Sequence, residues 1–288
     1  MASTATPAPY ADRFLTPNGV KLHFQDWSAP PGAPTLLMVH GITMQSHAFD
    51  PVAALLKERY RCVALDLRGH GDSARAEPPD YGYSAYAQDV LALLDALGID
   101  RVNYLGTSLG GRIAMTIAER HPERLGRVAL NDISPEHAGA GLARIGKVIG
   151  GERPAFPSVE AYVEQVLFAY APHVKALPMD MVVKSARWHL REVEGGLRPK
   201  FDPRALRRLG DQAALEEGTR MLWRGFRAMR GPLLLLRGER SDILLPEAAR
   251  RMQEAQPAMR LVEIPGVGHA PTLVEPAARQ ALEAFFSE

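Results

Sequence analysis

Gly106-Thr107-Ser108-Leu109-Gly110 decides the fold of this 288-residue chain, because it joins a strand pattern to a helix pattern. The short apolar run VNYLG (102–106) reads as a buried strand, and LGGRIAMTIAER (109–120) reads as a helix that ends before Pro122. A serine at such a junction sits in a sharp turn with its hydroxyl exposed, and the flanking glycines let strand and helix approach closely. We therefore predict that Ser108 is a nucleophile.

The same alternation extends in both directions along the chain. Further strands are expected at 20–27, 35–39, 61–67, 127–131, 232–238 and 260–266, and helices at 49–59, 246–255 and 273–286. Residues 20–27 alternate like a half-exposed strand, whereas the others are continuous apolar runs, as buried parallel strands are. The pattern predicts an α/β fold with a mostly parallel sheet covered by helices on both faces.

The alternation breaks between about Ser134 and Arg230, where the chain reads as helices and loops rich in arginine. We predict three parts: a core over 1–134, a helical cap over 135–230 inserted after the sixth strand, and the rest of the core over 231–288.

Composition narrows the class of protein. With a net charge of +1, nothing points to a nucleic-acid or membrane partner, and no apolar run is long enough to span a bilayer. The N-terminus lacks a secretory signal pattern, Pro7 and Pro9 suggest a loose leader, and the single Cys62 cannot form an internal disulfide, so we expect a cytoplasmic protein. No metal-ligand spacing is found, and the sequence indicates no oligomeric state.

A serine nucleophile needs a base and an acid, and their chain order is characteristic. His269, in the glycine-rich loop after the last strand, is the predicted base. Asp242, just past the strand at 232–238, is our first choice for the acid, and Asp132, just past the strand at 127–131, is the alternative. Both follow carboxyl ends of strands, where active-site groups of open α/β sheets collect.

The reaction also needs hydrogen-bond donors for a developing oxyanion. The backbone N–H of Leu109, directly after the nucleophile, is one candidate. The N–H of Ile42, in the loop that begins His40-Gly41-Ile42-Thr43, is the other.

Taken together these motifs resemble the α/β-hydrolase superfamily. The resemblance rests on HGIT (40–43), DLRGHGDS (66–73), GTSLGG (106–111), RGERSD (237–242) and GVGH (266–269), in that order. It implies an eight-stranded sheet and a capped, esterase-like hydrolase with a serine nucleophile. Asp66, Arg68, His70 and Asp72 are read as residues that fix a loop. Members that use an aspartate nucleophile, the haloalkane dehalogenases and epoxide hydrolases, do not fit Ser108.

HGIT, LRGHGDS and the segment GGLRP (195–199) are also similar to the branch that cleaves the amide of 2-(acetamidomethylene)succinate in vitamin B6 breakdown. That branch places its acid after the sixth strand, so the resemblance keeps Asp132 open.

The expected function is hydrolysis of a carboxylic ester, or a related acyl bond, of a small molecule through an acyl-enzyme, with no cofactor and no metal. One alternative is a C–C bond or amide hydrolase of an aromatic or heterocycle breakdown pathway. Another is a ligand receptor of the same fold with slow turnover.

Specificity is expected to lie in the cap. Arg144, Arg187, Arg191 and Arg198 could bind a substrate carboxylate, although a solvated helix face is the favoured explanation for them. Trp188 and the aromatic residues Phe156, Tyr162, Phe168 and Tyr170 could line an apolar pocket or pack the cap.

Overall fold

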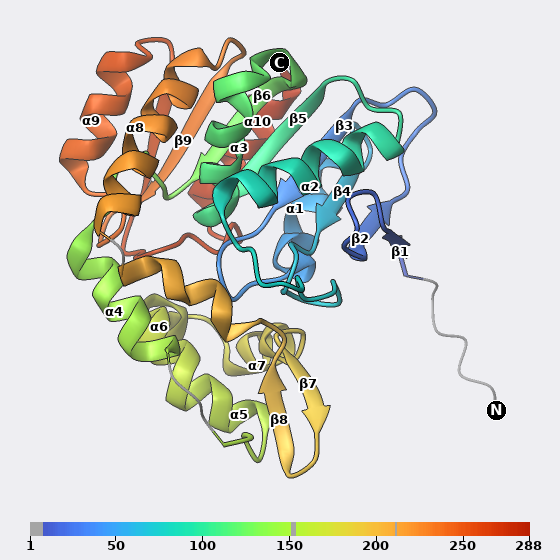
Figure 1. Cartoon of the computed structure of the whole chain (residues 1–288), viewed down its shortest axis with the longest axis vertical. Coiled ribbons are helices and arrows are strands. Elements are labelled where there is room, and N and C mark those ends of the chain that lie inside the picture. Colours follow the sequence, from blue (N-terminus) through green and yellow to red (C-terminus); the bar gives the residue numbers. More distant parts are fainter. Residues whose placement is uncertain (1–7, 151–153, 211) are drawn as a thin grey trace.

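The computed structural model describes residues 8–150, 154–210 and 212–288, without the side chains of 207–215. An eight-stranded sheet has the spatial order β1-β2-β4-β3-β5-β6-β9-β10 (Figure 1). Its strands are β1 (Tyr10–Leu15), β2 (Leu22–Trp27), β3 (Thr35–Val39), β4 (Arg61–Leu65), β5 (Val102–Thr107), β6 (Leu125–Asn131), β9 (Leu233–Gly238) and β10 (Arg260–Ile264). Strand β2 pairs antiparallel with β1 and β4, and every other pair in this sheet is parallel, which confirms the mostly parallel sheet.

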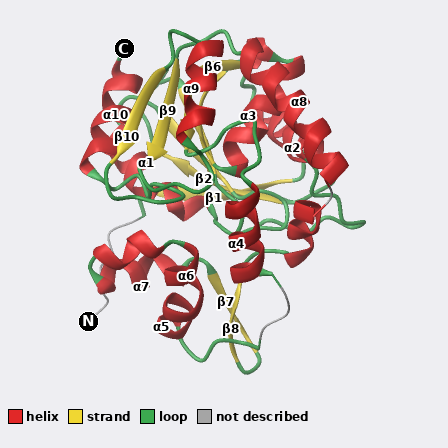
Figure 2. Cartoon of the chain, turned by 90° about the vertical axis from the view of Figure 1, so that its left-hand side faces the viewer, coloured by secondary structure: helices red, strands yellow, loops and turns green. Residues whose placement is uncertain are grey.

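Helices cover both faces of the sheet because its strands are apolar on both sides. In β3, Leu37 and Val39 join the core on one face, and Leu36 and Met38 join the core on the other. The first face carries α2 (Tyr83–Ala96), α3 (Leu109–Arg120), α8 (Gln212–Ala228) and α9 (Pro246–Ala255). The second carries α1 (Asp50–Leu56) and α10 (Pro276–Ser287) (Figure 2).

Two strand predictions need correction. Residues 20–27 were expected to be half-exposed, but β2 is almost wholly buried, with His23 and Gln25 inside. Strand β1 was not predicted, because YADRFL is a mostly exposed edge strand without a clear apolar alternation. The proposed leader residue Pro7 lies outside the described residues, and Pro9 directly precedes β1.

Between β6 and β9, the described residues of 139–199 form a second layer on one end of the core (Figures 1 and 2). Its regular elements are α4 (Gly139–Ile149), α5 (Val159–Tyr162), α6 (Phe168–Tyr170), α7 (Met179–Arg187), β7 (Leu190–Val193) and β8 (Gly196–Pro199). The antiparallel pair β7–β8 was not expected in a segment predicted as helices and loops.

Helix α8 also differs from the prediction, which placed it in the cap of residues 135–230. Leu222 and Phe226 are fully buried in the core, and Gly225 lies against the backbone of Met115 in α3. The chain has therefore returned to the core before residue 230.

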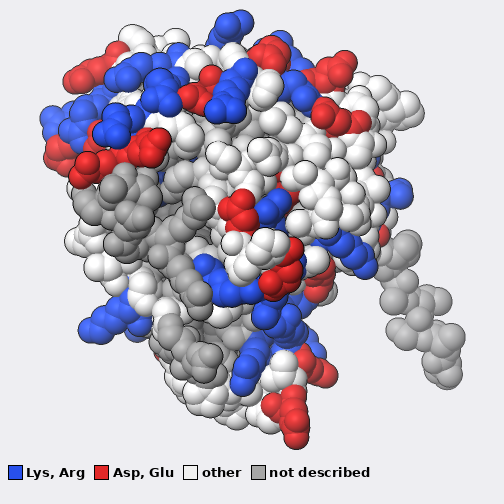
Figure 3. All heavy atoms as spheres, viewed as in Figure 1, with Lys and Arg blue, Asp and Glu red and all other residues white. Residues whose placement is uncertain are grey.

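Positive and negative side chains lie interspersed on the face of the molecule that Figure 3 shows. Within the described residues, no helix combines the length and apolar character needed to cross a membrane.

The contact between α8 and α3 yields a stability prediction. A Cβ at Gly225 would overlap the carbonyl oxygen of Met115, so Gly225→Ala should lower the free energy of unfolding by about 2 kcal/mol or more. In the same helix, a Cβ at Gly218 would meet only Tyr83 Cε2, at 3.7 Å. Gly218→Ala should therefore be neutral or stabilising by up to ~1 kcal/mol. Urea denaturation of both variants checks this, and equal destabilisation would contradict it.

Candidate active site

Ser108 lies in the turn between β5 and α3 with φ 50° and ψ −111°, a backbone conformation that residues other than glycine rarely adopt. Its N–H donates to the carbonyl of Asn131 in β6, at 3.0 Å. A Cβ at Gly110 would overlap the carbonyl of Val39, and one at Gly106 would clash with the backbone of Gly110. The glycines are therefore needed for the close approach of α3 to β3 and β5, which fixes the serine at the strand ends.

His269 lies against this serine. Its Nε2 is 3.0 Å from Ser108 Oγ, and the imidazole is almost completely buried. The histidine belongs to the loop after β10, 161 residues further along the chain, as the sequence order predicted.

Asp132 lies on the other side of the imidazole. Its Oδ2 is 2.8 Å from His269 Nδ1 and accepts a hydrogen bond from the Ser241 hydroxyl at 2.6 Å, while Oδ1 accepts from the Gly238 N–H at 2.8 Å. Asp132 is fully buried and has a positive φ of 56°. The Gly238 N–H and the Ser241 hydroxyl thus fix the orientation of the carboxylate toward His269.

The first choice for the acid, Asp242, is not in that place. Its carboxylate is bound by Arg144 of α4, at 2.5 Å from Nε and 2.8 Å from Nη2. Partial burial alone would raise the pKa of Asp242, but the hydrogen bonds and charge of Arg144 hold it below its usual value. Asp132 directly follows β6, which lies beside β5, whereas Asp242 stands four residues beyond the end of β9, where α4 meets the loop.

The two expected oxyanion donors flank the serine. Leu109 is the first residue of α3, so its N–H has no acceptor within the helix. A Cβ at Gly41 would lie 3.3 Å from Ser108 Cβ, which places the loop containing Ile42 beside the nucleophile. Their role as oxyanion donors stays a prediction.

His40 holds this loop in place. The N–H of Leu67 donates to His40 Nε2 at 3.0 Å, so Nδ1 carries the proton and donates to the Gly41 carbonyl at 2.7 Å. Complete burial lowers the pKa of His40 to about 3, and the imidazole therefore stays neutral in this position.

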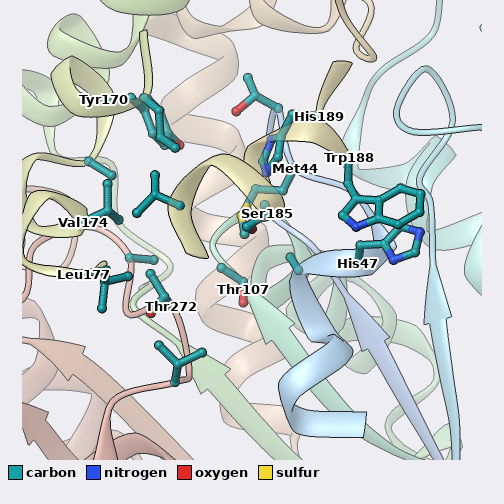
Figure 4. A pocket seen from close by; sticks show the side chains of 18 of the residues that line it. Met44, His47, Thr107, Tyr170, Val174, Leu177, Ser185, Trp188, His189 and Thr272 are labelled. Carbon is teal, nitrogen blue, oxygen red and sulfur yellow. The ribbon is translucent and has the colours of Figure 1, made fainter. Parts of the chain in front are cut away.

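Ser108 opens onto two cavities. The first, about 360 Å3, also includes His269 and lies between the core and the second layer (Figure 4). Its walls are mainly apolar and include Val166, Leu167, Val174 and Leu177 from the inserted segment. The second cavity, about 540 Å3, contains Ser108 together with Ile42, Leu109, Tyr83 and Arg112.

The cap residues expected to bind substrate are distributed differently. Arg144 is engaged by Asp242, while Arg187, Arg191 and Arg198 are exposed and line neither cavity. Trp188 does line the first cavity, at its edge, where its ring stacks on His47 with centroids 3.6 Å apart.

The aromatic predictions are divided in the same way. Tyr162 and Tyr170 line the first cavity, whereas Phe156 is packed in the core cluster and Phe168 packs against it.

The DLRGHGDS residues fix loops, as expected. Asp66 accepts from the backbone N–H groups of Ser46 and Asp72, and Arg68 pairs with the buried Asp89. Among the described residues, one group, His23, Asp66 and Asp72, has the spacing of a metal site. Both ring nitrogens of His23 are already engaged, by Asp66 and Asp12, so this group is better described as a hydrogen-bond network.

Comparison with known proteins gives a consistent result. Residues 34–157 match a family model described as the alpha/beta hydrolase fold. The chain is 31% identical over 281 residues to 3-hydroxybutyrate-oligomer hydrolase of Cupriavidus necator, covering 95% of both proteins. It is 30% identical over 249 residues to 2-(acetamidomethylene)succinate hydrolase of Mesorhizobium japonicum, covering 84% of both. A crystal structure of an alpha/beta hydrolase from Novosphingobium aromaticivorans is similar with a TM-score of 0.85 and 31% identity, over 98% of this chain and 99% of that one.

The two aspartates can be distinguished by the reactivity of Ser108. Asp132→Asn should slow phosphonylation of Ser108 by an organophosphonate probe by about 10^3-fold or more, because the imidazole loses the carboxylate that orients it. Asp242→Asn, which removes a charge of the same size one loop away, should change the rate by less than about tenfold. Mass spectrometry of the labelled protein gives both rates, and the reverse order would assign the acid to Asp242.

Proposed function

This chain belongs to the α/β-hydrolase family, and on that premise we propose that it hydrolyses a carboxylic ester of a small molecule through an acyl-enzyme on Ser108. The observation that carries the proposal is the continuous contact from Ser108 Oγ to His269 Nε2, at 3.0 Å, and from His269 Nδ1 to Asp132 Oδ2, at 2.8 Å. A hydroxyl, an imidazole and a buried carboxylate in this order form the arrangement that activates serine for acyl transfer.

In the first step, Ser108 Oγ attacks the ester carbonyl carbon while His269 Nε2 takes the hydroxyl proton. The carbonyl oxygen becomes an oxyanion, for which the N–H groups of Ile42 and Leu109 are the proposed donors. When the intermediate collapses, the imidazolium gives its proton to the leaving alkoxide. The alcohol departs and the acyl group remains on Ser108.

In the second step, His269 takes a proton from water as the water oxygen attacks the acyl carbon. Collapse of the new intermediate returns that proton to Ser108 Oγ and releases the carboxylic acid. Asp132 keeps the Nδ1 proton in place and stabilises the imidazolium in both steps. Its anchoring by Gly238 and Ser241 means that little reorganisation is needed as charge develops.

An ester is favoured over an amide by the relative with the larger coverage, whose name specifies an oligomer of a hydroxy acid. The mainly apolar first cavity also suits an aliphatic chain. An amide substrate is the second candidate, because the relative from Mesorhizobium japonicum acts on an acetamido compound. The same catalytic groups serve either bond, and the leaving group alone differs.

Replacing the nucleophile tests the proposal. Ser108→Ala should reduce turnover of p-nitrophenyl butyrate by about 10^3-fold or more, because no acyl-enzyme can form. The wild-type protein, quenched during turnover, should carry a butyryl group on the peptide that contains Ser108. The variant's urea midpoint serves as the folding control, and turnover at the wild-type rate by a folded Ser108→Ala protein would disprove the proposal.

A pair of substrates with the same butyryl group separates the remaining functions. The ethyl ester should be hydrolysed faster than the N-ethyl amide, and repeated turnovers should follow the first without a stall. Added methanol should divert only a minor fraction of the acyl group to methyl butyrate if water is the normal acceptor. Faster hydrolysis of the amide than of the ester would favour an amide hydrolase. One burst of product followed by a stall would favour a ligand receptor with slow turnover.

A further inference from the structure

Arg112 is a buried cation that has no carboxylate partner among the described residues. Its side chain, one helical turn after Ser108 in α3, is only 5% exposed. No ion pair involves Arg112 in the part of the chain that the structure describes. Four neutral groups accept its hydrogen bonds: the Ser134 carbonyl at 3.3 Å, the Glu136 carbonyl at 2.7 Å, His137 Nδ1 at 2.8 Å and the Tyr83 hydroxyl at 3.1 Å. Burial of a charge is costly unless an opposite charge or strong hydrogen bonds offset it.

Neither His137 nor the side chain of Glu136 brings a negative charge to Arg112. Burial, and then the charge of Arg112, lower the pKa of His137 to about 3, so this imidazole accepts a hydrogen bond but brings no charge. The carboxylate of Glu136 points to Arg251 instead, at 2.8 and 2.5 Å.

Two donors remain available on residues that line the second cavity. The Nε2–H of His137 also has no acceptor among the described residues, but His137 does not line that cavity. A guanidinium has five N–H groups, and the four hydrogen bonds leave one on Nη2. The Tyr83 hydroxyl accepts from Arg112, and its own proton is donated to no acceptor among the described residues. One carboxylate could take both protons through its two oxygens.

The second cavity connects this cluster to the nucleophile, since Tyr83, Arg112, Leu109 and Ser108 all line it. Three acidic residues line this cavity, and none of them forms an ion pair with Arg112 among the described residues. Asp80 accepts a hydrogen bond from the Gly82 N–H at 3.0 Å, Glu119 pairs with Arg224 at 2.8 Å, and Glu217 is exposed.

We propose that Arg112 and Tyr83 bind a free carboxylate of the substrate while the scissile acyl group lies at Ser108. The inference rests on the proposed function and adds the substrate class: esters that end in a carboxylic acid. It also replaces the cap arginines of the sequence prediction with an arginine from the core. The buried guanidinium gains an opposite charge when substrate binds, so a neutral analogue forgoes a charge-assisted hydrogen bond.

A carboxylate-terminated ester and its methyl ester test this directly. 3-Butyryloxybutyrate and methyl 3-butyryloxybutyrate carry the same scissile butyryl ester, and only the first has a free carboxylate. Half-esters of four- to six-carbon diacids, each compared with its diester, vary the distance between the scissile ester and the carboxylate. We expect kcat/KM for the acid of the best pair to exceed that for its neutral partner by about tenfold or more, mainly through KM. No turnover of any ester would refute the proposed function, and turnover without preference for the acid would refute only this inference.

Variants then assign the preference to its residues. Tyr83→Phe removes one hydroxyl and should reduce the acid-to-neutral ratio several-fold, while Arg112→Met should bring it near one. Arg187→Gln, which removes an exposed cap arginine, should leave the ratio unchanged. Arg112 also holds the loop after Asp132, so a purely structural role would lower kcat for both esters equally and preserve the ratio. That result, or a ratio that Tyr83→Phe does not change, would overturn the assignment.

Discussion

The hydrogen bond between Asp132 Oδ2 and His269 Nδ1 joins parts of the chain 137 residues apart, and the rest of the site depends on it. It forms because parallel strands end at one edge of a sheet, where the loops after β5, β6, β9 and β10 meet. Asp132 and Ser108 both have positive φ angles, a local cost that the surrounding backbone hydrogen bonds offset. The geometry is thus held in place before any substrate arrives.

Asp242 also follows a strand end, but it pairs with Arg144 and not with His269. Its pairing with Arg144 connects the loop after β9 to α4, and Arg144 also donates to the Tyr170 carbonyl at 2.6 Å. One partly buried ion pair therefore links the core, α4 and the end of α6, which lines the first cavity. The aspartate predicted to orient the histidine instead fixes the segment that covers the site.

The two cavities have complementary chemistry. The first offers mainly apolar walls from the inserted segment, and the second places the buried charge of Arg112 on the core side of the nucleophile. A substrate that is apolar at one end and anionic at the other would match both, with the scissile bond at Ser108.

Outside β1 and the inserted segment, the sequence itself determined the succession of strands and helices, and it also determined the insertion after the sixth strand and the place of Ser108 in a strand–helix turn. Each of these features is local, because apolar runs and the glycines at 106 and 110 indicate it. Only the tertiary structure showed that Asp132 contacts His269 while Asp242 contacts Arg144, because both aspartates follow the carboxyl ends of adjacent strands and differ only in the side chains beside them. It also decided that α8 packs on the core and that Arg112 is buried with no counter-charge from the residues that the structure describes. Side chains at equivalent chain positions are distinguished by partners distant in sequence, and those partners come together only when the chain is folded.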